Sequence, residues 1–178
     1  MLPHLRAAFP DIPFVGTVPA IKPACSASQT KLVSVLGTEA TVAREYTKKL
    51  ISDFGQGCEV TLVGSRRLAV LAEAQLRGES VDDADIADEI APCFVERNGL
   101  RTDTVVMACT HYPLLDTQLA RLAPWPVTFV DPAPAIARRV VDLLGPAVTA
   151  SAKAGSQFVF TSGRRPAPAL EAVFSRFG

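Results

Sequence analysis

The sequence predicts an α/β fold with a mainly parallel sheet. Two observations predict it. Short runs rich in β-branched residues alternate with helical patterns along the chain, at the spacing of βαβ units. One run, residues 104–108, reads Thr-Val-Val-Met-Ala, as expected of a strand that is buried on both faces of a parallel sheet.

The first half of the chain contains two strand–helix units. Residues 31–36 are expected to form a strand that stops at Gly37, and residues 39–54 a helix, because apolar side chains share one stripe there. That stripe consists of Val42, Ala43, Tyr46, Leu50 and Phe54. Residues 59–63 are the next strand, ending at Gly64-Ser65, and residues 67–77 the next helix, which Gly78 closes.

The second half continues the alternation. Residues 82–97 are expected to form a helix, because Asp82 and Asp83 suit its positive N-terminal end and Asn98-Gly99 would end it. The expected elements after the strand over 104–108 are a helix over 114–122, a strand over 127–130 and a helix over 133–144. A loop over 147–155, a last strand over 157–160 and a short helix over 168–177 complete the chain.

The composition is that of an ordinary globular protein, since 48% of the 178 residues are apolar and 20% are charged. The 18 basic residues balance the 18 acidic ones, so the charge gives no footprint for nucleic acid or an anionic membrane. No apolar run approaches the ~20 residues that span a bilayer. Residues 1–6 do not begin a secretory signal, and we therefore expect a cytoplasmic protein.

Four cysteines and two histidines are the candidates for metal or thiol chemistry. No two cysteines form a C-x-x-C pair, so their spacing argues against zinc and we expect no metal site. In a cytosolic protein the thiols stay reduced, and a functional cysteine would act as a thiolate. For Cys25, Cys58 and Cys93 a core or surface role is the expected one.

Cys109 has the most informative surroundings. It ends the buried strand and directly precedes a helix, whose first turn suits Pro113. A cysteine at that point is close to free backbone N–H groups and to the positive end of the helix, which both favour a thiolate. His111, two residues further on, can donate a hydrogen bond or a positive charge. The alternative is a buried, inert cysteine at a strand end.

Thr38 and Thr41 begin the helix expected over 39–54, and two interpretations stay open for them. They either cap free N–H groups or contribute to a site for an anion at a helix N-terminus. Glu73 is the only acid on its helix, where a solvated carboxylate is the usual interpretation. A Cys–His pair also suits a hydrolase, but the sequence does not place the oxyanion hole and orienting residue that a hydrolase needs.

Four segments together resemble the glutamate racemase family of the aspartate/glutamate racemase superfamily. They are Val-Pro-Ala-Ile-Lys-Pro-Ala at 18–24, Val-Leu-Gly-Thr-Glu-Ala-Thr-Val at 35–42, Leu-Ala-Glu at 71–73 and Ala-Cys-Thr-His-Tyr-Pro-Leu-Leu at 108–115. Their order and spacing agree with the family from about residue 5 to residue 144.

The resemblance implies a fold of two similar α/β domains around a glutamate cleft, with one catalytic cysteine from each. One thiolate removes the α-proton and the opposite thiol returns a proton, without pyridoxal phosphate or a metal. By position, Cys109 is the second of these bases, with Thr110 and His111 as its substrate-contacting and supporting neighbours. Thr38 and Thr41 correspond to positions near bound glutamate, and Glu73 to an acid that lines the cleft. The family supplies D-glutamate for peptidoglycan, and its members often form homodimers.

Three motifs of the family, Asp-Ser-Gly, Pro-Tyr-Gly and Cys-Asn-Thr, do not occur in these 178 residues. We therefore expect residues 20–131 to form the complete second domain, and residues 1–19 and 132–178 to form a remnant of the first. The expectation is a racemase chain without its first catalytic cysteine, so full two-base racemisation by this chain alone is not expected. Two alternatives stay open: a one-cysteine relative of decarboxylase type, and a non-catalytic fragment.

Overall fold

A computed structural model describes residues 2–55, 57–145, 158–163 and 165–175. Its main sheet consists of four parallel strands: β1 (Leu32–Thr38), β2 (Glu59–Ser65), β5 (Thr104–Met107) and β6 (Thr128–Val130), in the order β2-β1-β5-β6. In register, Val35 of β1 lies between Leu62 and Val106. The predicted α/β fold with a parallel sheet is confirmed.

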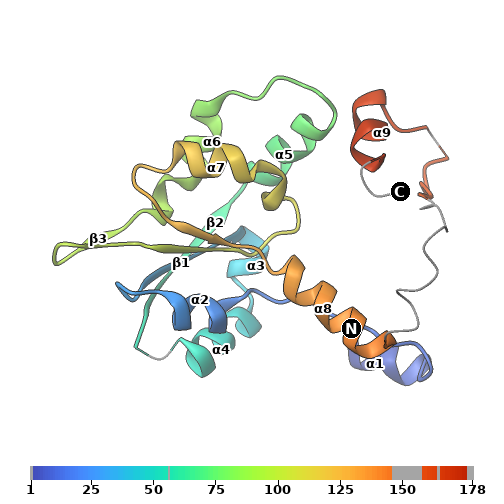
Figure 1. The fold of residues 1–178 in the computed structure, drawn as a ribbon, viewed down its shortest axis with the longest axis horizontal. Coiled ribbons are helices and arrows are strands. Elements are labelled where there is room, and N and C mark those ends of the chain that lie inside the picture. The colour runs from blue at the N-terminus through green and yellow to red at the C-terminus, as the bar shows by residue number, and fades with distance from the viewer. Residues whose placement is uncertain (1, 56, 146–157, 164, 176–178) are drawn as a thin grey trace.

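Helices cover both faces of this sheet (Figure 1). Helices α5 (Leu68–Leu76), α6 (Asp83–Ile90) and α7 (Asp116–Leu122) lie on one face, and α2 (Ile21–Ala27) and α4 (Glu45–Phe54) on the other. The side chains of β1 alternate between the two layers: Leu36 packs in the α5–α7 cluster, whereas Val33 and Val35 pack in the α2–α4 cluster. Burial on both faces explains why the strand sequences are so apolar.

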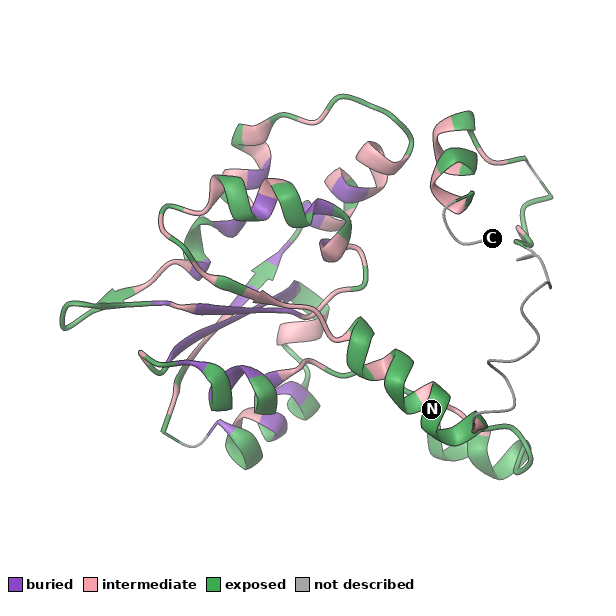
Figure 2. Ribbon diagram, viewed as in Figure 1, coloured by how far each residue is buried: buried purple, intermediate pink, exposed green. Residues whose placement is uncertain are grey.

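Other helices lie outside these layers. Helices α1 (Leu2–Ala8) and α8 (Ala133–Leu144) contain no buried residue, as Figure 2 shows. Helix α8 leaves the sheet after β6, and its far end approaches α1, since Arg6, Arg139 and Leu143 line one hollow. The short helix α9 (Pro168–Phe174) contacts α5. No helix among the described residues is long and apolar enough to cross a bilayer.

The expected single helix over 39–54 is wrong. The chain forms α3 (Glu39–Val42), leaves the helical conformation at Arg44 (φ −68°, ψ 134°), and starts again as α4. The buried Thr47 explains the break, because its hydroxyl donates to the Thr41 carbonyl (2.8 Å) and replaces a helical N–H partner there. As a result Tyr46 and Phe54, expected on the buried stripe, are exposed.

The expected helix over 82–97 is also wrong beyond its first part. Helix α6 ends at Ile90, a 3₁₀ turn (Ala91–Cys93) follows, and the chain then enters a hairpin of β3 (Glu96–Arg97) and β4 (Leu100–Arg101). Pro92 lies in the 3₁₀ turn and cannot continue an α-helix. Asn98 and Gly99 both have positive φ (53° and 76°), which makes them the hairpin turn and not a helix end.

Smaller differences concern element ends. Strand β1 does not stop at Gly37 but continues to Thr38, because Gly37 and Gly64 pair within the sheet. The helix expected over 114–122 starts as a 3₁₀ turn (Tyr112–Leu115) before α7. Residues 158–160 are not a strand. The loop expected over 147–155, residue 157 and the end of the helix expected over 168–177 lie outside the described residues.

Candidate functional site

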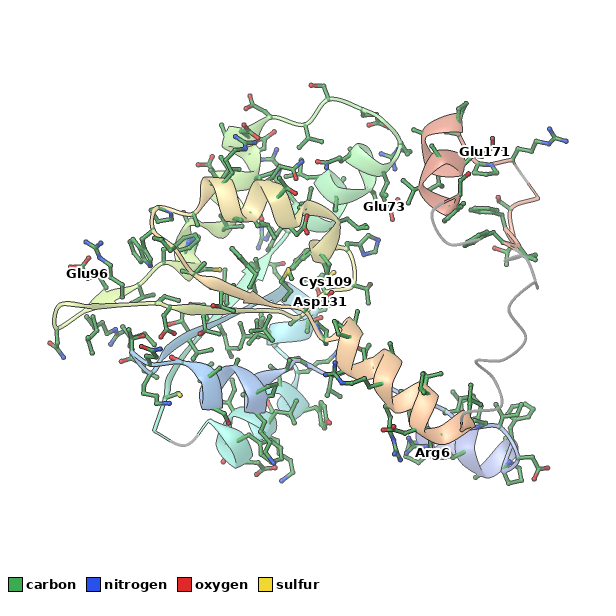
Figure 3. The ribbon with its side chains drawn as sticks, in the orientation of Figure 1. Arg6, Glu73, Glu96, Cys109, Asp131 and Glu171 are labelled. Atoms are coloured by element: carbon green, nitrogen blue, oxygen red, sulfur yellow. The ribbon has the colours of Figure 1, made fainter. Side chains whose placement is uncertain are left out.

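The carboxyl ends of the parallel strands meet at one edge of the sheet, where ligands bind in open α/β sheets. Cys109 lies at this edge, near the point where α8 departs (Figure 3). The Ala108 N–H donates to the Leu36 carbonyl (2.8 Å), so sheet bonding extends one residue past β5. Cys109 therefore directly follows the last residue that is hydrogen-bonded within the sheet.

A cavity of about 150 Å³ adjoins Cys109. It is lined by Thr17, Val18, Pro19, Thr41, Arg44, Tyr46, Thr47, Ala108, Cys109, Thr110 and Pro132. Two larger hollows, of about 660 and 290 Å³, lie along residues 10–23 and α8 and contain no thiol. Another, of about 330 Å³, is lined by Lys22, Cys25, Ser26, Lys31, Asp53 and Phe54. We take the cavity beside Cys109 as the candidate site, because it lies at the carboxyl ends of the strands and its lining combines a thiol with several hydroxyls and a cation, whereas burial raises the pKa of the Cys25 thiol in the other hollow.

Behind Cys109 lies a short chain of polar contacts. The Cys109 Sγ is 3.8 Å from His111 Nδ1, and His111 Nε2 is 2.7 Å from Glu73 Oε1 on α5. An ionised Glu73 accepts the proton of Nε2, which leaves Nδ1 as the ring nitrogen that faces the sulfur. The fold thus connects three predicted residues, Glu73, Cys109 and His111, by direct polar contacts, although Glu73 and His111 are 38 positions apart in the sequence.

The predicted threonines have different positions. Thr41 and Thr110 line the cavity, whereas Thr38 does not. Thr38 caps α3, since its hydroxyl accepts the Thr41 N–H (3.2 Å), and the two hydroxyls are 2.9 Å apart. Gly37 and Gly64 let α3 lie this close to the strands, because a Cβ on Gly64 would meet the Glu39 Cα at 3.1 Å. The capping interpretation holds for Thr38, and Thr41 also borders the cavity.

Ser65, at the end of β2, is committed to structure. Its hydroxyl donates to Glu89 (2.6 Å) and accepts the Leu68 N–H (2.9 Å), which fixes the start of α5. Helix α5 carries Glu73, so this network positions the carboxylate that contacts His111.

The other three thiols do not line the cavity. Burial, together with the Cys58 thiol, raises the pKa of Cys25 to about 12. Burial alone raises the pKa of Cys93 to about 12. Neither thiol is ionised at neutral pH, which leaves Cys109 as the thiol in contact with both the cavity and a histidine.

Sequence reasoning missed Arg44, Tyr46 and Thr47, which border the cavity from the break between α3 and α4. No local signal marks that break, since the segment is free of Gly and Pro. Among the described residues, no group of three or more His, Cys, Asp or Glu side chains gathers in a way that could hold a metal ion.

Sequence comparison identifies the relatives of this chain. The sequence profile of the Asp/Glu/Hydantoin racemase family matches residues 1–140. This chain belongs to that family. A glutamate racemase of Brucella canis is 52% identical over 180 residues, which cover all of this chain and 65% of the relative. A glutamate racemase of Brucella anthropi is 58% identical over 146 residues, covering 82% of this chain and 52% of the relative. The match thus spans 65% of the length of the Brucella canis relative and 52% of the Brucella anthropi relative.

Solved racemase structures share the fold. Escherichia coli glutamate racemase, in complex with L-glutamate and the activator UDP-MurNAc-Ala, matches with a TM-score of 0.83 and 37% identity, over 99% of this chain and 66% of the other. The RacE1 glutamate racemase of Bacillus anthracis matches with a TM-score of 0.62 at 23% identity. The racemase fold expected from the motifs is confirmed over nearly the whole chain.

Proposed function

We propose that this chain carries the Cys109 side of a glutamate racemase site and exchanges the α-proton of glutamate without a cofactor. The observation that carries the proposal is the placement of the Cys109 thiol, which borders a hydroxyl-lined cavity and contacts a histidine held by a carboxylate. The relatives that match the whole chain are glutamate racemases, which supports glutamate as the substrate. In bacteria the product would be D-glutamate for peptidoglycan.

In the proposed step, the Cys109 thiolate takes the α-proton of glutamate as the C–H bond breaks. The electron pair stays on the α-carbon and the adjacent carboxylate delocalises it. His111 Nδ1, 3.8 Å from the sulfur, is placed to exchange a proton with the thiol. Thr110, next to the thiol in the cavity lining, is placed to donate to the α-carboxylate. Inversion needs a second acid on the opposite face of the α-carbon.

We also propose that residues 20–131 are one racemase domain and that residues 1–19 and 132–178 belong to the other. In the described part of the chain, all buried residues lie between Ile21 and Leu119, and both α1 and α8 have none. The second acid of the reaction would then belong to that other domain.

Proton exchange tests the function. The chain is incubated with L-glutamate and separately with D-glutamate in deuterated water, and NMR follows the α-proton while chiral analysis follows inversion. We expect exchange of one enantiomer that Cys109→Ala abolishes and the control Cys58→Ala retains. Absence of exchange with both enantiomers would contradict the proposal. Exchange with inversion would place a second acid within this chain.

A further inference from the structure

Cys25 and Cys58 are in contact with each other, although 33 positions separate them in the sequence. The Cys58 thiol donates to the Cys25 carbonyl, with 3.5 Å between the sulfur and the oxygen. Cys25 lies in α2 and Cys58 directly precedes β2, so the contact arises from the packing of α2 against the sheet. Neither thiol lines the candidate site, and the proposed reaction uses neither.

The sheet separates this pair from the other two cysteines. All four cysteines of the chain lie in the part that the structure describes. Cys25 and Cys58 pack in the cluster on the α2–α4 face, whereas Cys93 and Cys109 pack in the cluster on the α5–α7 face. A disulfide forms without backbone movement only between cysteines whose side chains already lie close together. In this fold, each thiol of the pair therefore has the other as its partner within the chain.

The two thiols differ in accessibility. Cys25 is only 5% exposed, and burial together with the Cys58 thiol raises the pKa of Cys25 to about 12, so Cys25 stays protonated at neutral pH. Cys58 is partly exposed, and oxidants attack accessible thiols first. The Lys31 ammonium donates to the same Cys25 carbonyl (3.1 Å), which puts a positive charge beside the pair. That charge stabilises the negative charge that a sulfur carries as it attacks.

We propose that Cys25 and Cys58 form a site of reversible oxidation, at which hydrogen peroxide converts the two thiols into a disulfide. In the first step the Cys58 sulfur attacks one peroxide oxygen and the O–O bond breaks. The other oxygen leaves as water with the thiol proton, and Cys58 becomes a sulfenic acid. In the second step the Cys25 sulfur attacks the Cys58 sulfur, the S–O bond breaks, and the hydroxyl leaves as water with the Cys25 proton. Two electrons pass from the two sulfurs to the peroxide, which balances the reaction.

The disulfide would connect α2 to the start of β2 and close residues 26–57 into a loop. This loop contains β1, α3 and α4, and with them Thr41, Arg44 and Thr47 from the lining of the candidate site. A link across such a segment removes conformations from the unfolded chain, so the oxidised protein should be the more stable form. Oxidation would thus stabilise one wall of the cavity without changing a residue in it.

Peptide mapping after treatment with hydrogen peroxide tests the proposal. Trypsin cleaves the chain at several sites between positions 25 and 58, so a disulfide leaves two linked peptides that mass spectrometry detects without a reductant. In the folded chain, the Cys25–Cys58 link should exceed every link from this pair to a cysteine on the other face by at least about tenfold, and dithiothreitol should remove it. In Cys25→Ala, dimedone should trap a sulfenic acid on Cys58, whereas in Cys58→Ala it should label Cys25 at least about tenfold less.

Urea unfolding tests whether the bond fits the native fold. The oxidised chain should unfold at a urea concentration about 1 M higher than the same sample after dithiothreitol, because the link restricts the unfolded chain. Cys58→Ala, treated identically, should show no such rise. Irreversible oxidation of Cys58 without a linked peptide, or equal amounts of links across the sheet, would overturn the proposal. So would a linked chain that unfolds at the same or a lower urea concentration than the reduced chain.

Discussion

His111 connects two groups that the sequence separates widely, the thiol of Cys109 and the carboxylate of Glu73. The side chains of His111 and Glu73 are 36% and 45% exposed, so their hydrogen-bonded contact adds little to stability. Its effect is on orientation, because a carboxylate at Nε2 fixes which ring nitrogen carries the proton. Glu73 is thus a positioning residue, which acts on the thiol through the imidazole.

Glu73→Gln should therefore lower the rate of α-proton exchange by at least about tenfold with little change in stability. The amide can still bond to the ring, but it can donate to Nε2 and favour the tautomer with the proton on Nδ1. The pH profile of exchange should shift, which a purely structural role would not produce. Glu79→Gln, which removes a nearby carboxylate bonded to Arg77 and not to His111, is the matched control. Equal rates and profiles in the two variants would refute the positioning role.

At the scale of elements, Asp103 stabilises the end of the sheet that lies opposite the candidate site, where the strands begin. It directly precedes β5. Its carboxylate accepts the Ser28 hydroxyl and the Gln29 N–H (both 2.7 Å), the Thr30 N–H (2.9 Å) and the Thr104 hydroxyl (2.8 Å). Partial burial opposes ionisation, but these donors together lower the pKa of Asp103 to about 2. The carboxylate joins the turn after α2 to the central strands, and so aligns β1 with β5.

Because the pKa of Asp103 falls on folding, ionisation of this group stabilises the folded state above about pH 4. That contribution should be lost as the pH falls from about 4 towards 2. Asp103→Asn should lower the free energy of unfolding at pH 7 by about 1–2 kcal/mol and reduce the acid-dependent loss. Urea unfolding at several pH values measures both effects, with the exposed Asp88→Asn as the control. An unchanged pH dependence in Asp103→Asn would argue against this role.

The sequence predicted these elements well where local pattern decides them. Strands β1, β2, β5 and β6 and helices α5 and α8 lie where apolar runs, helix formers and closing glycines indicated. The failures have tertiary causes or neglected turn signals. The break at Arg44 depends on a hydroxyl bond made by a buried Thr47, which no periodicity contains. Asn98-Gly99 is a residue pair typical of hairpin turns, but the helical pattern before it favours a helix that ends there.

The same contrast applies to the candidate site. Cys109 and His111 are neighbours in the sequence, and their strand-end position could be predicted from the apolar run before them. The contact of His111 with Glu73 depends on how α5 packs against the turn after β5, and neither the residue pattern nor the family resemblance, which assigned Glu73 to the cleft lining, predicted it. Arg44 could not be predicted, since it reaches the cavity only through the break between α3 and α4.

At the scale of the whole molecule, the buried residues that the structure describes all lie between positions 21 and 119, in one cluster on each face of the sheet, and the described residues of the outer segments are exposed or half-buried. Apolar side chains on these outer segments, such as Phe9, Ile12 and Val141, are about half exposed. The matched racemases are longer than this chain, which spans 65% of the Brucella canis protein. The core nevertheless brings the carboxyl ends of β1 and β5 together beside one cavity. The Cys109 side of the proposed glutamate site therefore consists of residues that the structure describes.

The most direct test of that claim is the rate at which iodoacetamide alkylates each cysteine of the folded protein. Mass spectrometry measures this rate with and without glutamate. Cys109 borders the cavity and Cys58, also partly exposed, lies outside it, so one molecule contains both the probe and its control. We expect that glutamate slows alkylation of Cys109, leaves the alkylation rate of Cys58 unchanged, and protects Cys109 more than glutamine does. Equal alkylation of Cys109 with and without saturating glutamate would contradict a glutamate site at this thiol.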